Sequence, residues 1–227
     1  MSLSVTRIGL QFSNVYLLDW EASQVLIDAG MSWDAAPILK HPKLDLNRLL
    51  MILLTHAHID HFGAAAAIRR AAGTPVAIHI ADSDALRRGR SPLGQPRGLG
   101  RLLILAAKLL ERVQPPEPCE PDQLLEEGDM LNLPGMSARV LHTPGHTHGS
   151  CTFLFDGQYA FVGDLLSTTG QAHVQRYLAQ DWAVLYDSVR RVQSANPEWV
   201  YPGHGDRPIE GAALSELAEQ ALQRPHA

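Results

Sequence analysis

The chain has 227 residues, of which 45% are hydrophobic and 19% are charged, and its formal net charge is −5. These values are typical of a globular protein with one large or two small domains and enough apolar residues for a core. Nucleic-acid binding is not expected, because it needs a basic face.

The cysteine content and the N-terminus predict the compartment. Two cysteines, Cys119 and Cys151, cannot form a disulfide framework, which favours a reducing cytosol. Residues 1–12 contain no long apolar region, and no stretch approaches the roughly 20 apolar residues of a transmembrane helix. We therefore expect a soluble, cytoplasmic protein with no membrane partner.

The first part of the chain is predicted to be mainly β-structure. Residues 3–8, 14–20 and 23–28 are short β-type runs, and residues 33–40 are expected to be helical. The third run ends at Asp28. This residue is either a turn residue at a strand end or a carboxylate that orients a metal-binding histidine.

A dense cluster of polar side chains follows the apolar run 49–54. Residues 55–61 read THAHIDH, so His56, His58, Asp60 and His61 lie within six positions. The apolar run predicts a buried parallel strand, and open α/β sheets place their ligands at the C-terminal ends of such strands. Neutral imidazole and carboxylate suit zinc, and imidazole also suits iron. Asp60 has a second interpretation, as the N-cap of a helix predicted to run from His61 to Ala72.

A segment of different character covers residues 81–121. After a short strand at 76–80, in which His79 is expected to be packed, apolar residues at three- and four-residue spacing from Leu99 to Val113 predict a helix. This helix either packs on its own core or forms a lid or a homodimer surface beside a site. The arginines of the segment are solvated or contact an anionic substrate.

The β pattern then resumes, and polar motifs again follow the strands. His146 lies in a Pro-Gly turn, Asp164 follows a strand, and His204 lies in a PGHG segment. His148 is expected to be an exposed loop residue, and His142 a structural one. His173 and Tyr177, in a loop predicted at 165–180, are expected to face a substrate. The predicted strands are 130–133, 137–142, 151–155, 158–163 and 198–201, and the predicted helices are 181–194, capped by Asp181, and 211–223.

These motifs resemble those of a known family. THAHIDH is similar to the HxHxDH signature of the metallo-β-lactamase fold superfamily, and TPGHTHGS, VGD and PGHG follow in the order that this family shows. The resemblance spans essentially the whole chain. It implies one α/β (α+β) domain over residues 1–227, a four-layer αββα sandwich with a helical insertion at about 81–121 between its two halves.

The resemblance also implies a ligand set for two divalent metal ions. His56, His58 and His146 would hold the first ion, Asp60, His61 and His204 the second, and Asp164 would bridge both. The family has an Asp at the place of Asp28, which would orient a ligating histidine. Zinc is the expected metal, and His/Asp sites also accept iron and manganese.

The implied chemistry is hydrolysis of a small-molecule substrate. A metal lowers the pKa of bound water to about 7, which provides hydroxide to attack a carbonyl. Asp60 would be the catalytic residue that orients the hydroxide or passes a proton to the leaving group. The sequence looks closest to the glyoxalase II-like and lactonase-like hydrolases, so we expect an ester, thioester or lactone. Little chain follows His204, which argues against glutathione specificity, and a β-lactam substrate is less expected.

Two other functions are open at this point. A protein similar to the persulfide dioxygenases would use a single iron for oxidation, with fewer ligands than this chain offers. A metal-stabilised binding protein without turnover would use the apolar helix of the 81–121 segment to contact a partner. Metal content and a substrate panel distinguish these functions.

Overall fold

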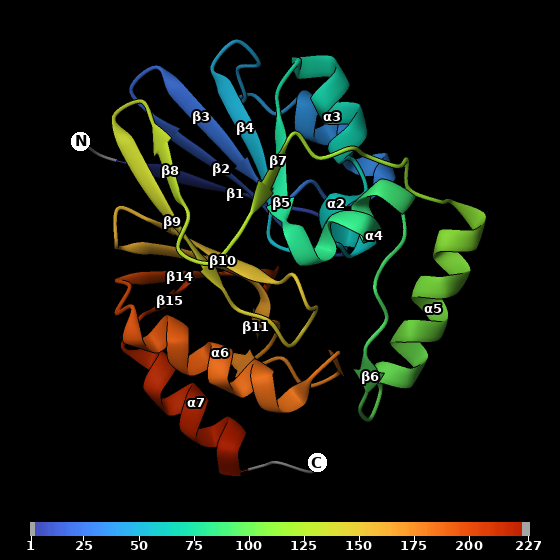
Figure 1. Cartoon of the computed structure of the whole chain (residues 1–227), viewed down its shortest axis with the longest axis vertical. Helices are drawn as coiled ribbons and strands as arrows, with labels where there is room; N and C mark the ends of the chain where they lie inside the picture. Colours follow the sequence, from blue (N-terminus) through green and yellow to red (C-terminus); the bar gives the residue numbers. More distant parts are fainter. Residues whose placement is uncertain (1–2, 224–227) are drawn as a thin grey trace.

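Two β-sheets pack face to face in the centre of the molecule, in a computed structural model that describes residues 3–223 (Figure 1). The first sheet has the strand order β1-β2-β3-β4-β5-β7. The strands from β3 onward are parallel to one another, whereas β1, β2 and β3 form an antiparallel meander. Their bounds are β1 Ser4–Gly9, β2 Asn14–Trp20, β3 Ser23–Ile27, β4 Leu49–Leu54, β5 Val76–His79 and β7 Gln123–Leu125.

The second sheet has the order β15-β14-β11-β10-β9-β8, with β12 paired to β11. Its strands are antiparallel except for the pair β11 and β14. A separate pair joins β6 (Gln95–Pro96) to β13 (Leu178–Ala179). The bounds are β8 Met130–Leu133, β9 Met136–His142, β10 Cys151–Phe155, β11 Tyr159–Thr168, β12 His173–Val174, β14 Trp199–Gly205 and β15 Ile209–Glu210.

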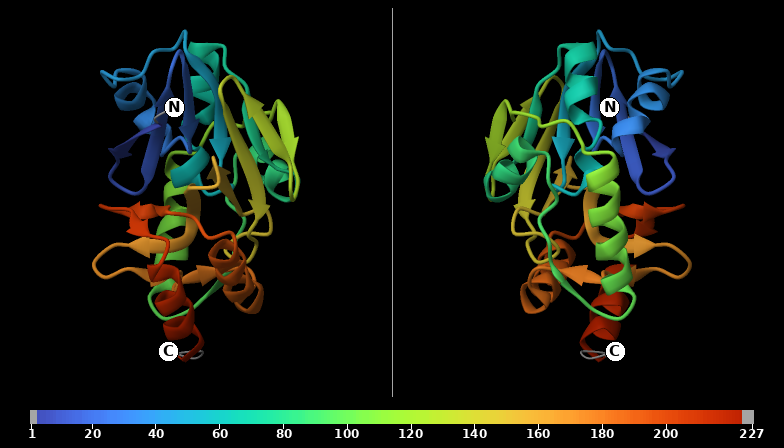
Figure 2. Two further views of the ribbon diagram at one scale, coloured as in Figure 1. Left: turned by 90° about the vertical axis from the view of Figure 1, so that its left-hand side faces the viewer. Right: turned by 90° about the vertical axis from the view of Figure 1, so that its right-hand side faces the viewer.

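Helices cover the outer face of each sheet (Figures 1 and 2). The first sheet is covered by α1 (Ala35–Leu39), α2 (Ile59–Phe62), α3 (Ala65–Ala72) and α4 (Ser83–Arg88), with short 3-10 turns at Ser32–Asp34 and Ile80–Asp82. The second sheet is covered by α6 (Trp182–Ser194) and α7 (Ala213–Gln223). Helix α5 (Gly100–Val113) runs along one side, outside these layers. This mixed α/β sandwich is the predicted fold.

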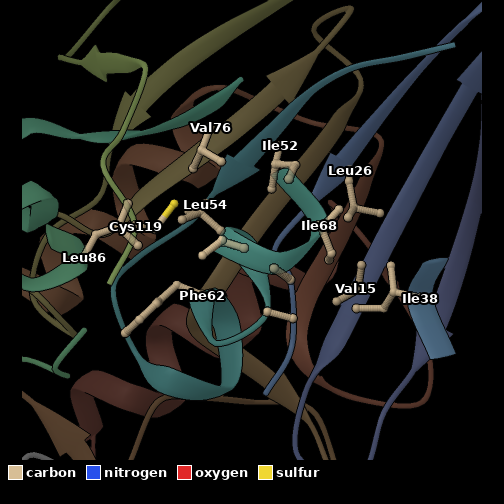
Figure 3. Close-up of a cluster of buried hydrophobic side chains, with 14 of the residues drawn as sticks. Val15, Leu26, Ile38, Ile52, Leu54, Phe62, Ile68, Val76, Leu86 and Cys119 are labelled. Atoms are coloured by element: carbon tan, nitrogen blue, oxygen red, sulfur yellow. The ribbon is translucent and has the colours of Figure 1, made fainter. Parts of the chain in front are cut away.

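Successive side chains of a strand point to opposite faces of its sheet, so each strand of the first sheet contributes to two cores. Along β2, Val15 and Leu17 belong to the core between the first sheet and its helices, whereas Tyr16 and Leu18 belong to the core between the two sheets. Figure 3 shows the first of these cores, where Phe62 of α2 and Ile68 of α3 meet the strands. A third core lies under α6 and α7.

The helix predicted from His61 to Ala72 is two helices. Helix α2 ends at Phe62 and α3 begins at Ala65. The chain leaves the helical path because the Ala64 amide donates to Gly30 O at 3.3 Å, and a side chain on Gly63 would lie 2.9 Å from that same oxygen. Asp60 lies inside α2, and His58 occupies the N-cap position, so the capping interpretation of Asp60 was wrong.

Two other segments also differ from prediction. The loop predicted at 165–180 contains the end of β11 together with β12 and β13. Helix α5 contacts the core of the first sheet through Leu110, but Leu102, Leu105 and Leu109 are 64%, 65% and 62% exposed, so the core-packing interpretation holds for only part of its apolar face. Between residues 3 and 223, no helix combines the length and the apolar character needed to cross a bilayer.

Candidate metal centre

The structure brings together all seven residues that the sequence motifs single out, in two adjacent groups. Within each group, the candidate ligand atoms lie within 4.8 Å of one another. Helix α2 and the turn before it provide four of these residues, and the other three come from the loop after β9 and from β11 and β14. The first group is His56, His58, His146 and Asp164, and the second is Asp60, His61 and His204.

Three imidazoles of the first group point their ring nitrogens at one another. His58 Nδ1 lies 3.1 Å from His56 Nε2 and 2.8 Å from His146 Nε2. The other ring nitrogens of His58 and His146 lie 2.9 Å from Pro92 O and 2.8 Å from Leu178 O. A carbonyl oxygen only accepts hydrogen bonds, so those nitrogens carry the protons. In the neutral form that binds a metal, each ring therefore presents a lone pair on its inward nitrogen.

In the second group, a buried carboxylate orients an imidazole. Asp28 Oδ2 lies 2.8 Å from His61 Nδ1, and the same carboxylate accepts from the Thr55 amide at 2.8 Å. Asp28 is in the left-handed backbone region with φ of 62°, which Asp tolerates better than most residues. This geometry agrees with the orienting interpretation of Asp28. His61 Nε2 then points toward Asp60 Oδ2 at 3.6 Å.

Asp164 lies between the two groups. Its Oδ2 is 3.0 Å from His204 Nε2 and 3.3 Å from His146 Nε2, and its Oδ1 is 3.2 Å from His61 Nε2. Gly203 makes room for this convergence, because a Cβ there would lie 2.5 Å from Asp164 Oδ1. The first glycine of the PGHG segment, Gly203, is therefore needed at the site itself.

The donor set fits a bound cation. Buried His61 Nε2 and Asp164 Oδ1 have no hydrogen-bond partner among the described residues. Lone pairs that face each other at 2.8 Å repel, unless a positive charge lies near them. A divalent cation in each group would satisfy both conditions, since imidazole nitrogen and carboxylate oxygen are its usual ligands.

The electrostatics of the ligands also favour metal binding. Burial, followed by the nearby His58, lowers the pKa of His146 to about 3, and burial lowers the pKa of His56 well below its ordinary value, so both rings are neutral at pH 7. Burial works against a charge on Asp164, but His204 and His61 hold the pKa of this carboxyl well below its ordinary range. Neutral imidazole and ionised carboxylate are the forms that bind metals.

The prediction from sequence missed Asp82, which joins the two loops of the first group. Its Oδ2 accepts hydrogen bonds from the Ala57 amide at 2.8 Å and from Thr147 Oγ1 at 2.7 Å, and its Oδ1 accepts from the Gly149 amide at 2.8 Å. The residue is 2% exposed. It lies among ordinary turn residues after β5, and no motif in the sequence indicates its role.

Other predicted residues lie away from the two groups. His173 and Tyr177 line a cavity of about 460 Å³ between the start of α5 and helices α6 and α7, and none of the seven candidates lines it. Their contact with substrate stays a prediction. His148 is exposed, as expected. The rings of His79 and His142 stack at 3.9 Å, which is consistent with the structural roles expected for them.

The chain is similar in sequence and in fold to known proteins. A family model described as the metallo-beta-lactamase superfamily matches residues 8–204. An uncharacterized protein of Mycobacterium tuberculosis is 32% identical over 90% of this chain and 91% of its own length. An acyl-coenzyme A thioesterase of Gallus gallus is 26% identical over 85% of this chain and 72% of its own.

One of the similar solved structures is described as containing metal. The crystal structure of TTHA1623, described as a di-iron-bound form, is 32% identical, covers 94% of this chain and 98% of its own, and has a TM-score of 0.67. The matched family model covers the strands and loops that carry all seven candidate ligands. The chain belongs to the metallo-β-lactamase superfamily.

Proposed function

We propose that the protein is a binuclear metal-dependent hydrolase that cleaves an ester, thioester or lactone, with a thioester as the first candidate. The observation that carries this proposal is the position of Asp164 between two complete ligand groups. Two groups that share one carboxylate are suited to two cations a short distance apart, which is the arrangement of many binuclear hydrolases. The thioesterase relative supports the choice of bond.

Each candidate ligand has a role in this proposal. His56, His58 and His146 would hold one cation, Asp60, His61 and His204 the other, and Asp164 would bridge them. Zinc remains the expected metal. The di-iron form of TTHA1623 supports two sites, and it makes iron the metal to compare with zinc.

The bound cations would supply a water of lowered pKa and polarise the carbonyl of the substrate. The protein's own contribution is to position groups and to hold protons. Asp28 keeps the proton of His61 on Nδ1, which leaves Nε2 free to bind. Asp60 is 24% exposed at its side chain and is the more accessible of the two carboxylates. It is therefore the group we expect to orient the attacking water or to pass its proton to the leaving group.

Metal quantification combined with a substrate panel tests this proposal. The protein is loaded separately with zinc and with iron, and each form is assayed on an aryl ester, an acyl-coenzyme A thioester, a lactone and a β-lactam. We expect two ions per chain and hydrolysis of at least one of the first three substrates. One iron per chain with oxygen uptake would support the dioxygenase alternative instead. Two ions without turnover on the whole panel would support the binding protein.

A further inference from the structure

Helix α5 has a row of apolar side chains that no described part of the chain covers. Leu102, Leu105, Leu109 and Val113 are 64%, 65%, 62% and 75% exposed. Figures 1 and 2 show the helix along one side of the molecule, outside the helical layers of the sandwich. Contiguous exposed apolar surface of this kind marks an interaction site.

The orientation of α5 is fixed by its opposite side. Ile104, Ala107, Leu110 and Glu111 are half-buried, and Leu110 packs against the core of the first sheet. Glu111 Oε1 accepts a hydrogen bond from the Ser91 amide at 2.8 Å. The leucine row therefore cannot turn inward without breaking these contacts.

Positive charges border the exposed leucine row on one side. At 3.6 residues per turn, the side chains from Leu105 to Val113 cover about 80° of the helix, and the half-buried Leu110 separates them from Leu103. Arg101, Lys108 and Arg112 follow next around the helix. Among residues 3–223, none of these three cations forms a salt bridge.

Charge and composition select the partner. In an antiparallel two-fold pair of α5 helices, the basic flanks of the two copies would lie on the same side and repel. The core of a protein–protein interface is usually enriched in aromatic side chains, and α5 contains no aromatic residue. A helix with leucines on one face and lysine and arginine beside them is typical of helices that lie on anionic membranes.

We propose that α5 binds reversibly to an anionic lipid surface, with its leucines among the acyl chains and its cations at the headgroups. This inference reverses the expectation of no membrane partner, which came from the lack of a segment long enough to span a bilayer. A helix that lies in the membrane interface needs no such segment.

The lipid-binding helix is close to the metal centre along the chain and in space. Ser91 Oγ accepts from the Ile59 amide at 3.1 Å, and Pro92 O lies 2.9 Å from His58 Nε2. The segment that leads into α5 therefore supports the first ligand group. Docking of α5 would bring the metal centre near the lipid surface, whatever reaction occurs there.

Vesicle co-sedimentation tests the proposal with the full chain. We expect binding to vesicles of phosphatidylcholine with phosphatidylglycerol, much weaker binding to phosphatidylcholine alone, and release by salt. The double variant Leu102→Gln/Leu109→Gln should bind at least about tenfold less. Leu124→Gln/Met130→Gln removes two other exposed apolar side chains away from α5 and should bind as the parent protein does.

A second pair of variants tests the charges. Arg101→Gln/Lys108→Gln should weaken binding to anionic vesicles by about tenfold, whereas Lys40→Gln/Arg139→Gln, which removes two other exposed cations, should have little effect. Unchanged melting temperature and metal content show that each variant is folded.

Two outcomes would overturn the proposal. One is failure of the parent protein to bind anionic vesicles. The other is a concentration-dependent dimer in solution that the Leu102→Gln/Leu109→Gln variant abolishes, which would assign the leucine row to a second copy of the chain. Neither outcome bears on the proposed hydrolysis, which is measured with soluble substrates.

Discussion

The two ligand groups differ in their access to solvent. In the first, His56 and His146 are 1% and 2% exposed, and uncharged carbonyl or hydroxyl oxygens lie at the outer ring nitrogens of its histidines. In the second, the side chains of Asp60 and His204 are 24% and 26% exposed, and a carboxylate orients His61. For the two cations of the proposed hydrolase, this difference predicts a firmly held first ion and a second that exchanges more readily beside the substrate.

Removing the residue between the groups should have the largest effect. Asp164→Ala leaves His61 and His204 without their central carboxylate. We expect hydrolysis to fall more than about 100-fold, since loss of a partner outside the coordination sphere alone costs about 10–100-fold. Metal content, measured with activity, should fall below two ions per chain. Asp187→Ala, at an exposed residue of α6, is the control, and full activity in Asp164→Ala would contradict the bridging role.

Removing the charge behind His61 should weaken one group and spare the other. Asp28→Asn keeps the shape of the side chain, and Asn also tolerates the left-handed backbone found there. We expect about 10–100-fold lower affinity for the second cation and an unchanged first site, measured by metal titration. The exposed Asp45→Asn serves as the matched control. Equal weakening of both sites would show that the groups are not independent.

Acidification should release the two proposed cations one after the other, the second before the first. Burial opposes a charge on His61 and His204, but the carboxylates around them, Asp164 first, raise the pKa of each ring. Protons therefore compete with the second cation at a higher pH, whereas His146, with a pKa near 3, stays neutral. Metal content followed from pH 8 downward should fall first to one ion and only later to none. Simultaneous loss of both ions would contradict the comparison.

The smallest effect on metal binding is expected from a change at Asp82, which joins the two loops of the first group. Asp82→Ala leaves the amides of Ala57 and Gly149 without partners. We expect a loss of about 2–4 kcal/mol in the free energy of unfolding, measured with urea, while the metal stoichiometry is unchanged. The exposed Asp84→Ala, two residues along, should cost less than about 1 kcal/mol.

Local signals in the sequence predicted most of the fold and of the candidate site. The run 49–54 coincides with β4, and Asp181 caps α6 by accepting from two amides, as expected. The candidates at 56–61 were identifiable because three imidazoles within six residues are rarely needed for packing, whereas His146, Asp164 and His204 were assigned through the resemblance to the family. Asp28 was left open between two roles, because a strand-end Asp has the same sequence context in both.

The sequence by itself therefore determined which residues are candidate metal ligands, because such ligands must be particular residue types next to particular turns. Only the tertiary structure decided which partners those residues meet. Asp82 was missed because its three donors come from two distant loops, and Pro92 and Leu178 act through backbone oxygens that every residue has. The periodicity of α5 predicted a helix, but periodicity does not show what covers an apolar face, and here the chain leaves that face exposed.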